Sequence, residues 1–516
     1  MAQPIRLLTP GILQVITDRV EPVLAAIPSA CAIQGGIEAP WTDAVAETLA
    51  ALGVTSVSPI VRDFKFPGPW PAMAHQHSIS SFMVLNPRGF VFADMGTGKT
   101  ASAIWACMYL RQIKRIRRVL VVCPVSIMVD AWGGDLFKCD MTTPYALLYG
   151  SKEQRLKALA TNRFWNIINF DGVETIRPEL LTAGFDAIII DESRAYANTA
   201  TARWKHLSAI SRDASYVWAL SGTPTTKSPL DAHGQAAIVR PGSVSSKTRF
   251  RDATMTQIRQ HVWVPKTNAW EYVTQILSPA IRIAKKDVLK DMPPVTYSYR
   301  KVDLSPGQRR AMSALKAEGM VDVGAGTVSA VTAAARRVKL LQIASGAVYD
   351  DTGAALQYDV DASPRVSELV EIIEEATRAV LVLVAFRHTA AMLGTKLAPL
   401  GFKTITGDTP RAQRTEYLAA MQAGTIKGIV AVAQTMSHGI TATAADTTVW
   451  FSPPIAGAEV YIQANNRMDR PGQKHSMQII HLYGSPLERD VYTSVQSAQS
   501  EQASFLAAYK KFLQGD

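Results

Sequence analysis

The chain has 516 residues, of which 47% are hydrophobic, and its 54 lysines and arginines exceed its 43 aspartates and glutamates by 11. The length predicts about three domains, and the hydrophobic content can fill several cores. The four cysteines have no Cys-x-x-Cys spacing, the N-terminus has no signal-peptide pattern, and the longest apolar runs are too short to cross a bilayer, which excludes secreted disulfide scaffolds and transmembrane proteins. We therefore expect a soluble intracellular protein whose thiols are buried.

Residues 1–62 carry no chemical motif. Apolar spacing over 13–27 predicts a helix, and Thr42 or Asp43 is expected to cap a second helix that runs through Ala50 and stops near Gly53. A small accessory domain and a helical pad on the next domain fit this region equally well.

A phosphate-binding loop is predicted at residues 93–100, which read Ala-Asp-Met-Gly-Thr-Gly-Lys-Thr. The loop follows the apolar run 89–92 and opens onto a stretch of helical composition at 101–111. Small residues let backbone N–H groups close around phosphate oxygens, Lys99 supplies a mobile positive charge, and the Thr100 hydroxyl can reach a magnesium ion. A glycine turn before an ordinary helix is the alternative, which the strand-loop-helix context disfavours.

The first part of the chain alternates short apolar runs with helical stretches such as 152–160, which predicts a parallel sheet covered on both faces. The runs rich in Val and Ile are 89–93, 118–124, 164–170, 186–190 and 216–220. Functional residues gather at the carboxyl ends of such strands. The fourth run leads into Asp191, which can hold magnesium, and Glu192, which can orient and deprotonate an attacking water; a helix-capping role is the alternative. The fifth leads into Ser221-Gly222-Thr223-Pro224, which alone reads as a tight turn.

The whole excess of positive charge lies between Arg240 and Ser345, a segment with 18 basic and 7 acidic residues. Neutralising the phosphates of a polyanion releases counterions and supplies affinity that does not depend on base sequence. The segment therefore predicts contact with nucleic acid, and a solvated surface of helical inserts is the alternative.

A second alternation of apolar runs predicts another α/β lobe of similar size. Its runs are 379–386, 403–406, 428–433, 447–451 and 477–483. Residues 463–473 within it read Gln-Ala-Asn-Asn-Arg-Met-Asp-Arg-Pro-Gly-Gln. Arg467 and Arg470 share a helical face by their spacing, and their guanidinium groups can stabilise charge on a phosphate. An ordinary surface helix is the alternative.

In this order, Ala-x-x-x-x-Gly-Lys-Thr, Asp-Glu-x-x and Ser-Gly-Thr-Pro resemble motifs I, II and III of the superfamily 2 helicases and translocases, and residues 463–473 resemble motif VI of their Swi/Snf-type branch. The resemblance covers roughly residues 70–490. Arg194 departs from it, because the branch often has histidine there. Other matching segments are Gln76 with its neighbours 74–75, 149–151, 282–287, 304–308, 341–343, 407–414 and 433–439.

The resemblance implies an α/β fold of two RecA-like parallel-sheet lobes, with a mostly helical insert between them and a small N-terminal accessory region. The expected parts are residues 1–62 for that region, 63–238 for the ATP-binding first lobe, 239–360 for the basic insert and 361–516 for the second lobe.

It also implies roles for individual residues. The expected catalytic residues are Lys99, Glu192, Arg467 and Arg470, and the expected magnesium ligands are Thr100 and Asp191. The residues expected to bind ATP are Gln76, Asp94, Met95, Gly96, Thr97, Gly98, Lys99, Thr100, Asp191, Gly439 and Gln463. Ser221 and Thr223 are expected to couple hydrolysis to movement. The expected nucleic-acid contacts are Arg336, Arg337, Lys339, Thr409 and Thr435.

These expectations describe a monomeric ATP-dependent translocase or helicase that moves along duplex or branched DNA without reading its sequence, with ATP and Mg²⁺ as cofactors. Replication and recombination proteins are the partners that the resemblance implies, in the cytoplasm of a bacterium or of a phage-infected cell. A strand-separating or branch-migrating helicase is the closer alternative. An ATP-switched nucleic-acid-binding module is the alternative from another class, and RNA is the alternative track.

Overall fold

The computed structural model describes residues 5–9, 12–17, 19–40, 45, 48–49, 52, 58–225, 228–260, 262–318, 320–323, 326–330, 332–349, 355–356, 361–436 and 441–514. The chain divides into two compact units: Met1–Val288 with Ser504–Asp516, and Leu289–Ala503. Among the described residues, no helix is long and apolar enough to cross a membrane.

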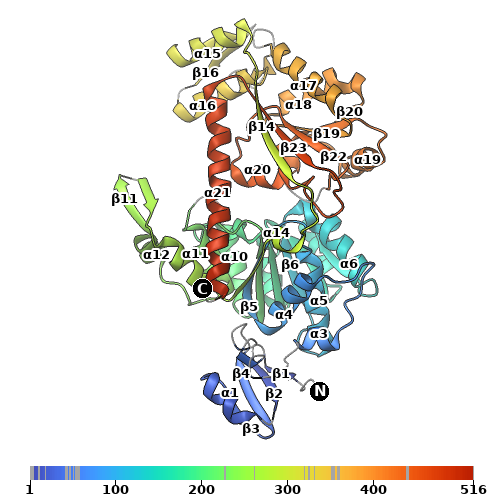
Figure 1. Cartoon of the computed structure of the whole chain (residues 1–516), viewed down its shortest axis with the longest axis vertical. Helices are drawn as coiled ribbons and strands as arrows, with labels where there is room; N and C mark the ends of the chain where they lie inside the picture. The colour runs from blue at the N-terminus through green and yellow to red at the C-terminus, as the bar shows by residue number, and fades with distance from the viewer. Residues whose placement is uncertain are drawn as a thin grey trace. The chain divides into compact units, whose positions relative to one another are not determined.

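The N-terminal region is a four-stranded antiparallel sheet with the order β1-β2-β4-β3 and one helix (Figure 1). Its elements are β1 Ile5–Thr9, β2 Ile12–Ile16, α1 Val20–Ala26, β3 Cys31–Ile33 and β4 Gly36–Pro40. The helix predicted over 13–27 is therefore wrong in its first part: Val15 of β2 packs in a small core with Val23 and Ile37, and this packing overrides the helical spacing. The capping residues proposed for a second helix, Thr42 and Asp43, lie outside the described residues.

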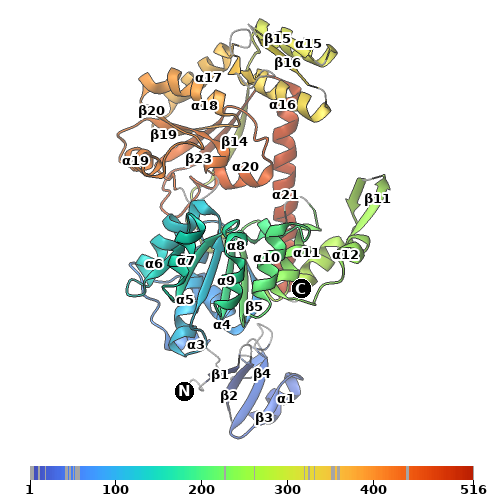
Figure 2. The ribbon, with the colours of Figure 1, turned by 180° about the vertical axis from the view of Figure 1, so that it is seen from behind.

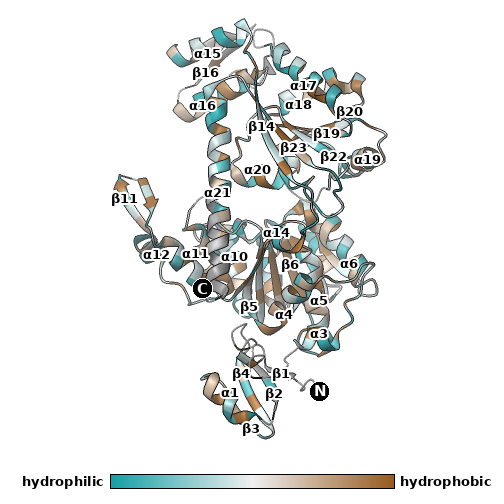
Figure 3. Cartoon of the chain, viewed as in Figure 1, coloured by the Kyte–Doolittle hydropathy of each residue, from teal (hydrophilic) through white to brown (hydrophobic). Residues whose placement is uncertain are grey.

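The first unit is built on a seven-stranded sheet, all parallel, with the order β13-β5-β10-β9-β6-β8-β7. Its strands are β5 Arg88–Ala93, β6 Val119–Cys123, β7 Tyr145–Leu148, β8 Trp165–Asn169, β9 Ala187–Asp191, β10 Tyr216–Ser221 and β13 Ala280–Ile283. Five of these are the predicted strands, and β7 and β13 at the two edges were not predicted. Figure 3 shows the strands as a largely hydrophobic block.

Helices cover both faces of this sheet, as predicted, because successive strand residues point to opposite cores. Val91 and Ala93 of β5 pack with α4 Ala74–Leu85 and α5 Lys99–Gln112, whereas Phe90 and Phe92 pack with helices such as α10 Ala202–Ser211 and α11 Asp231–Val239. The helical elements are α3 Pro59–Asp63, α4 Ala74–Leu85, α5 Lys99–Gln112, η1 Val125–Ile127, η2 Met128–Gly133, α6 Gly134–Cys139, α7 Lys152–Leu159, α8 Gly172–Thr175, α9 Arg177–Thr182, η3 Ser193–Tyr196, α10 Ala202–Ser211, α11 Asp231–Val239, α12 Lys247–Thr254, α13 Ala269–Ile276 and α14 Lys285–Val288. A hairpin of β11 Met255–Arg259 and β12 Val262–Pro265 follows α12.

The second unit has a six-stranded parallel sheet with the order β14-β23-β22-β19-β21-β20 (Figure 2). Its strands are β14 Val295–Lys301, β19 Ala379–Val384, β20 Phe402–Ile405, β21 Gly428–Val432, β22 Ala445–Trp450 and β23 Met477–Tyr483. The remaining elements are α15 Pro306–Glu318, β15 Met320–Val323, β16 Gly326–Ser329, α16 Ala333–Ala344, β17 Val348–Tyr349, β18 Ala355–Leu356, α17 Ser363–Glu375, α18 Arg387–Leu397, η5 Ala398–Leu400, α19 Arg411–Gln422, η6 Ala433–Met436, α20 Ala458–Asn465 and α21 Pro486–Gln514. Two parallel-sheet lobes with flanking helices are thus confirmed.

The stretch expected to be a helical insert, 239–360, also contains strands. Its β13 completes one edge of the first sheet and its β14 completes an edge of the second. The division between the two units falls inside it, after Val288. Both strands are short or polar on their outer side, so neither forms the continuous apolar run that marks a buried parallel strand.

Three cysteines are buried as predicted, namely Cys107, Cys123 and Cys139. The fourth, Cys31, is exposed and corrects the prediction. It begins β3, the edge strand of the N-terminal sheet, whose first two residues face solvent.

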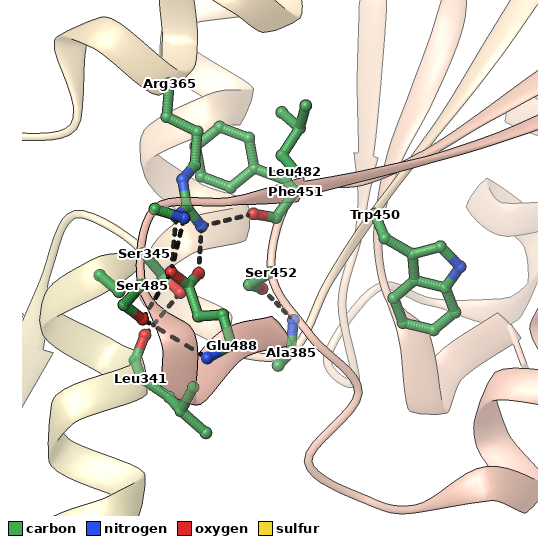
Figure 4. Close-up of polar contacts among 12 residues, drawn as sticks. Leu341, Ser345, Arg365, Ala385, Trp450, Phe451, Ser452, Leu482, Ser485 and Glu488 are labelled. Atoms are coloured by element: carbon green, nitrogen blue, oxygen red, sulfur yellow. Dashed lines mark hydrogen bonds and ion pairs between the residues drawn. The ribbon is translucent and has the colours of Figure 1, made fainter. Parts of the chain in front are cut away.

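A buried ion pair joins three elements of the second unit (Figure 4). Arg365 at the start of α17 binds both carboxylate oxygens of Glu488 on α21 at 2.6 and 3.0 Å, and also donates to the carbonyl of Phe451 after β22 at 2.9 Å. Glu488 accepts two further bonds, from the Gly484 N–H and the Ser485 hydroxyl. The side chains of Arg365 and Glu488 are 3% and 0% exposed, so water cannot replace a partner that is removed from the pair.

Glu488→Gln is expected to lower the free energy of unfolding by roughly 3 kcal/mol, because it leaves the Arg365 guanidinium buried without its counter-charge. Urea titration followed by circular dichroism measures the effect. Glu371→Gln, on the exposed side of α17, is the matched control and should change stability by less than about 0.5 kcal/mol. A change below about 1 kcal/mol in Glu488→Gln would show that the pair does not anchor α21.

Candidate nucleotide site

The phosphate loop joins the end of β5 to the start of α5. Gly96 and Gly98 have φ of +83° and +80°, in the left-handed region that favours glycine. Thr97 between them is 1% exposed, and its hydroxyl donates to the Asp94 carbonyl at 2.8 Å. The backbone N–H groups at the start of α5 therefore follow a tight turn, which is the geometry that binds phosphate oxygens.

Two side chains of α4 support the loop from below. The ring Nε2 of His75 donates to the Thr97 carbonyl at 2.9 Å. A Cβ atom on Gly98 would lie 2.0 Å from the amide nitrogen of Gln76, and the φ of +80° at Gly98 also favours glycine, so the two segments are in close contact. Gln76 is 6% exposed, and its Oε1 accepts the N–H of Met73 at 2.9 Å. The predicted upstream glutamine thus lies against the phosphate loop.

The Lys99 side chain lies at the carboxyl end of β5. Its Nζ donates to the carbonyl of Ala93, the last residue of β5, at 2.7 Å. A Cβ built on Gly222, at the end of β10, would lie 3.9 Å from the same Nζ and 3.9 Å from Cγ of Met95. The loop and the Ser-Gly-Thr turn therefore meet, as expected for the adjacent strands β5 and β10.

The acidic pair lies at the end of β9, which neighbours β10. Asp191 is 6% exposed, and its carboxylate accepts the indole N–H of Trp132 at 2.9 Å and the N–H of Glu192 at 3.0 Å. Glu192 has a φ of +54°, a strained conformation for a residue with a side chain. Its buried Oε2 has no hydrogen-bond partner among the residues that the structure describes. An unpaired carboxylate oxygen beside a phosphate loop is available to bind water.

Burial raises the pKa of Asp191 to about 6, with a further increase from the neighbouring Glu192 charge. The positive charge of Lys99 and the hydrogen bond from Trp132 act in the opposite direction, because both favour the ionised carboxylate. Sequence reasoning missed Trp132. It belongs to a π-helical turn, η2, which the one-dimensional pattern does not indicate.

Trp132→Phe is expected to move the acid limb of kcat/KM for ATP upward by about one pH unit. The indole bond favours the ionised form of Asp191, and a hydrogen bond to a charged group contributes about 1.5–3 kcal/mol, against about 1.4 kcal/mol for one pKa unit. Activity that needs the carboxylate is lost as the pH falls through its pKa, so the loss should begin at higher pH in the variant. Activity near pH 8 should stay within about threefold.

The matched control is Trp165→Phe, which removes a similar buried indole bond, to Asp140 at 2.8 Å, within the same unit. Its acid limb should stay where the wild-type limb lies. Coincident limbs for all three proteins would show that Trp132 does not set the charge of Asp191.

The predicted coupling residues lie beside the acidic pair. Ser221 is fully buried and accepts the N–H of Thr223 at 3.0 Å, and the Thr223 hydroxyl is buried with no partner among the described residues. Arg194, the departure from the family pattern, pairs with Asp231 of α11 at 3.5 Å within the first unit.

Part of the basic segment serves the phosphate loop. Arg282 of β13 pairs with the Asp94 carboxylate at 2.7 Å, and the N–H of Lys285 donates to the same carboxylate at 2.9 Å. Asp94, predicted to bind nucleotide, is thus held by residues that were predicted as the lead-in to the second lobe. The positive charge of Arg282 is used internally, since its side chain is only 7% exposed.

The second unit holds the remaining predicted nucleotide residues. Gln463 of α20 is 1% exposed, its Nε2 donates to Glu459 at 3.3 Å, and its buried Oε1 has no partner in the described part of the chain. Arg467 is 2% exposed, and its carbonyl accepts the N–H of Ala442. Gly439 lies outside the described residues.

Arg470 is held by two bonds from its guanidinium, to the Thr441 hydroxyl at 3.0 Å and to the Asn466 carbonyl at 3.3 Å. Burial lowers its pKa to about 10, so the group stays charged at neutral pH. Arg467 and Arg470 lie in the turns that follow α20, so the prediction that they share a helical face is wrong.

The residues predicted to bind nucleic acid differ in their exposure and in the hydrogen bonds that they already form. Arg337 is exposed on α16, and Arg336 is half-buried. Lys339 is also half-buried and donates to the Tyr349 carbonyl, so its charge is partly occupied. Thr409 accepts the N–H of Thr406 at 2.9 Å, and Thr435 donates to the Val432 carbonyl at 2.6 Å.

The donor set fits a magnesium ion that binds with phosphate. Thr100 is the second residue of α5, and Asp191 ends β9, so a hydroxyl and a carboxylate are offered from two elements at the same edge of the sheet. Magnesium prefers such oxygen ligands and usually combines one or two of them with phosphate oxygens and water.

Two family models match the chain: the SNF2-related domain over residues 75–345, and the helicase conserved C-terminal domain over residues 364–472. Among curated relatives, a SWI/SNF-related matrix-associated actin-dependent regulator of chromatin subfamily A-like protein 1 from Xenopus tropicalis is 27% identical over 75% of this chain and 40% of its own length. Putative protein p41 of Acyrthosiphon pisum secondary endosymbiont phage 1 is 26% identical over 54% of this chain and 64% of its own length. The chain thus spans less than two thirds of either relative.

Among solved structures, the Sulfolobus solfataricus SWI2/SNF2 ATPase core in complex with dsDNA aligns with 19% identity and a TM-score of 0.43, over 86% of this chain and 96% of that one.

Proposed function

The chain belongs to the SNF2-related family and carries the family's ATPase and helicase core, and from this premise we propose that it is a motor that uses ATP hydrolysis to move along duplex DNA. The observation that carries the proposal is the set of residues at the carboxyl ends of the strands of the first sheet. There the phosphate loop, the acidic pair and the Ser-Gly-Thr turn lie at the ends of three adjacent strands. One carboxylate oxygen of Glu192 has no hydrogen-bond partner among the described residues.

Each residue at this edge has a proposed task. Backbone N–H groups of residues 96–100 and the Lys99 ammonium are proposed to bind the phosphates, and Gln76, which lies against the phosphate loop, is proposed to contact the base. Glu192 orients the attacking water through its free oxygen and accepts its proton. Held by Thr100 and Asp191, Mg²⁺ would supply positive charge beside the phosphates. Charge-stabilising groups of this kind account for most of the catalysis of phosphoryl transfer.

The second unit is proposed to supply Arg467, Arg470 and Gln463 to the same nucleotide. Guanidinium groups that reach the γ-phosphate only in one conformation make hydrolysis depend on the motion of the units. Such motion shifts the grip of one unit along the phosphate backbone, and Ser221 and Thr223, between the nucleotide and the rest of the first unit, are proposed to relay it. Backbone contacts carry no base information, so movement without sequence preference follows.

Two other functions make different predictions. A strand-separating or branch-migrating helicase needs a wedge that parts the strands, and a fork-unwinding assay with a plain-duplex control detects its action. An ATP-switched binding module needs no stimulation of hydrolysis by DNA. A role in replication or recombination is a proposal consistent with any of these activities.

The decisive test is the ATPase rate measured side by side with blunt duplex DNA, single-stranded DNA, forked DNA and RNA. We expect stimulation of about tenfold or more by duplex DNA, and less by RNA. Arg337→Glu should weaken this stimulation and reduce the salt dependence of DNA binding by about one counterion. A rate that is equal with and without every nucleic acid would favour the switched module.

A further inference from the structure

The hairpin β11–β12 is an unusual surface of the first unit. In Figures 1 and 2 it extends from the end of α12 away from the seven-stranded sheet. Three of its aliphatic side chains are open to solvent: Ile258 is 57% exposed, Val262 44% and Val264 37%. Exposed aliphatic residues on a two-stranded ribbon gain nothing from the fold, and a cluster of them marks a contact surface.

The strand register gives the hairpin two different faces. Thr256 pairs with Val264, so these two side chains share a face with Val262, which lies two residues from Val264. Ile258 lies at the irregularity between Gln257 and Arg259, next to the turn. Trp263, which pairs with Gln257, lies on the opposite face with the Arg251 guanidinium 4.3 Å from its ring centre.

The segment that contains the hairpin is basic. Between Lys247 and Lys266 the chain has five basic residues and one acidic residue, Asp252. Asp252 is already paired with Arg251 at 2.8 Å. The guanidinium groups of Arg249 and Arg259 are exposed and form no ion pair with any described residue.

The combination selects one kind of partner. Cations alone bind the phosphates of any duplex. Aliphatic side chains reach base faces in a continuous duplex only by unstacking a base step, and unpaired bases do not carry that cost. An acidic peptide would satisfy the cations and leave the aliphatic face without a partner. Unpaired nucleotides satisfy both, since they offer phosphates and base faces together.

We propose that the β11–β12 hairpin binds unpaired nucleotides at a junction between duplex and single-stranded DNA, with Ile258 and Val262 against the bases and Arg259 and Arg249 on the phosphates. This rests on the proposed function, because it takes DNA as the track. The hairpin gives the motor a preference for forked or branched ends over continuous duplex.

The test compares the affinity of the full-length protein for a forked duplex and for a blunt duplex of equal length, by fluorescence anisotropy, with the ATPase rate on each. The wild type should bind the fork about tenfold more tightly. The variant Ile258→Ser with Val262→Ser keeps every charge, and should lose this preference while its affinity and ATPase rate on blunt duplex stay within twofold. Leu181→Ser on α9 is the matched control, because Leu181 is 43% exposed in the same unit and lies outside the hairpin; it should keep the full preference.

Two results would overturn the proposal. Equal wild-type affinity for both DNAs removes the junction site, even if both DNAs stimulate ATP hydrolysis. An unchanged preference in the serine variant shows that the junction is bound elsewhere and leaves the hairpin to a protein partner. Absence of DNA-stimulated hydrolysis contradicts the proposed motor instead, and is read from the ATPase rates independently of the binding ratio.

Discussion

Glu192→Gln is expected to lower the turnover number for ATP by about 10³-fold while the protein still binds ATP and DNA. The side chain keeps its size but loses the carboxylate oxygen that accepts a proton from water. The buried Oε2 of Glu192 has no hydrogen-bond partner among the described residues, so the substitution breaks no structural bond at that oxygen. Turnover is measured by phosphate release at saturating DNA, and ATP affinity by titration with a fluorescent nucleotide.

Glu153→Gln is the matched control, because Glu153 is an exposed glutamate on α7 of the same unit. Its turnover should equal that of the wild type. Residual turnover of about a tenth or more in Glu192→Gln would remove Glu192 from its role as the base.

Arg470→Ala should lower DNA-stimulated turnover by about 10³-fold or more, which is the usual effect of removing an arginine that stabilises charge on a transferring phosphoryl group. With a pKa of about 10 the guanidinium is charged throughout the assay range, so the loss should be the same from pH 7 to pH 8.5. Among the described residues the Arg470 side chain forms two hydrogen bonds, to Thr441 and Asn466, so the substitution should cost less than about 2 kcal/mol of stability.

The control for Arg470 is Lys474→Ala, which removes an exposed cation four residues further along the chain. Its turnover should stay within about twofold of the wild-type value, and any change should be confined to the salt dependence of DNA binding. A variant Arg470→Ala that keeps stimulated turnover within threefold of wild type would show that the second unit does not complete the nucleotide site.

The buried centre of both sheets could be predicted from the sequence. Fully buried parallel strands such as β6 and β21 consist of Val, Ile, Leu, Ala and Cys apart from Gly428, and short runs of this composition are typical of the centre of a parallel sheet. In the two parallel sheets, the strands that were not predicted, β7, β13 and β14, all lie at sheet edges, where one side of the strand has no neighbour and polar residues are tolerated. The strand β2 was taken for helix because five residues are too few to distinguish the two periodicities.

The places of the candidate site residues in the fold could be predicted where those residues lie close to a strand along the chain. Asp191 ends a strand, and the loop glycines, Lys99 and Glu192 each follow one within a few residues, so a strand prediction places them. Contacts between distant segments were not predictable: Trp132 reaches Asp191 across 59 residues, and Lys285 reaches Asp94 across 191. Close to this contact, Arg282 forms an ion pair with Asp94 of the phosphate loop. The number of basic residues in the segment is therefore larger than the number of cations that are available to bind DNA.

Movement along DNA is the central claim, and displacement of a third strand from a blunt duplex tests it most directly. A motor that translocates without separating strands should release the third strand when ATP is present, should fail with a non-hydrolysable analogue, and should leave the duplex intact. Glu192→Gln should release none. Rapid DNA-stimulated hydrolysis by the wild type with no release of the third strand would contradict translocation.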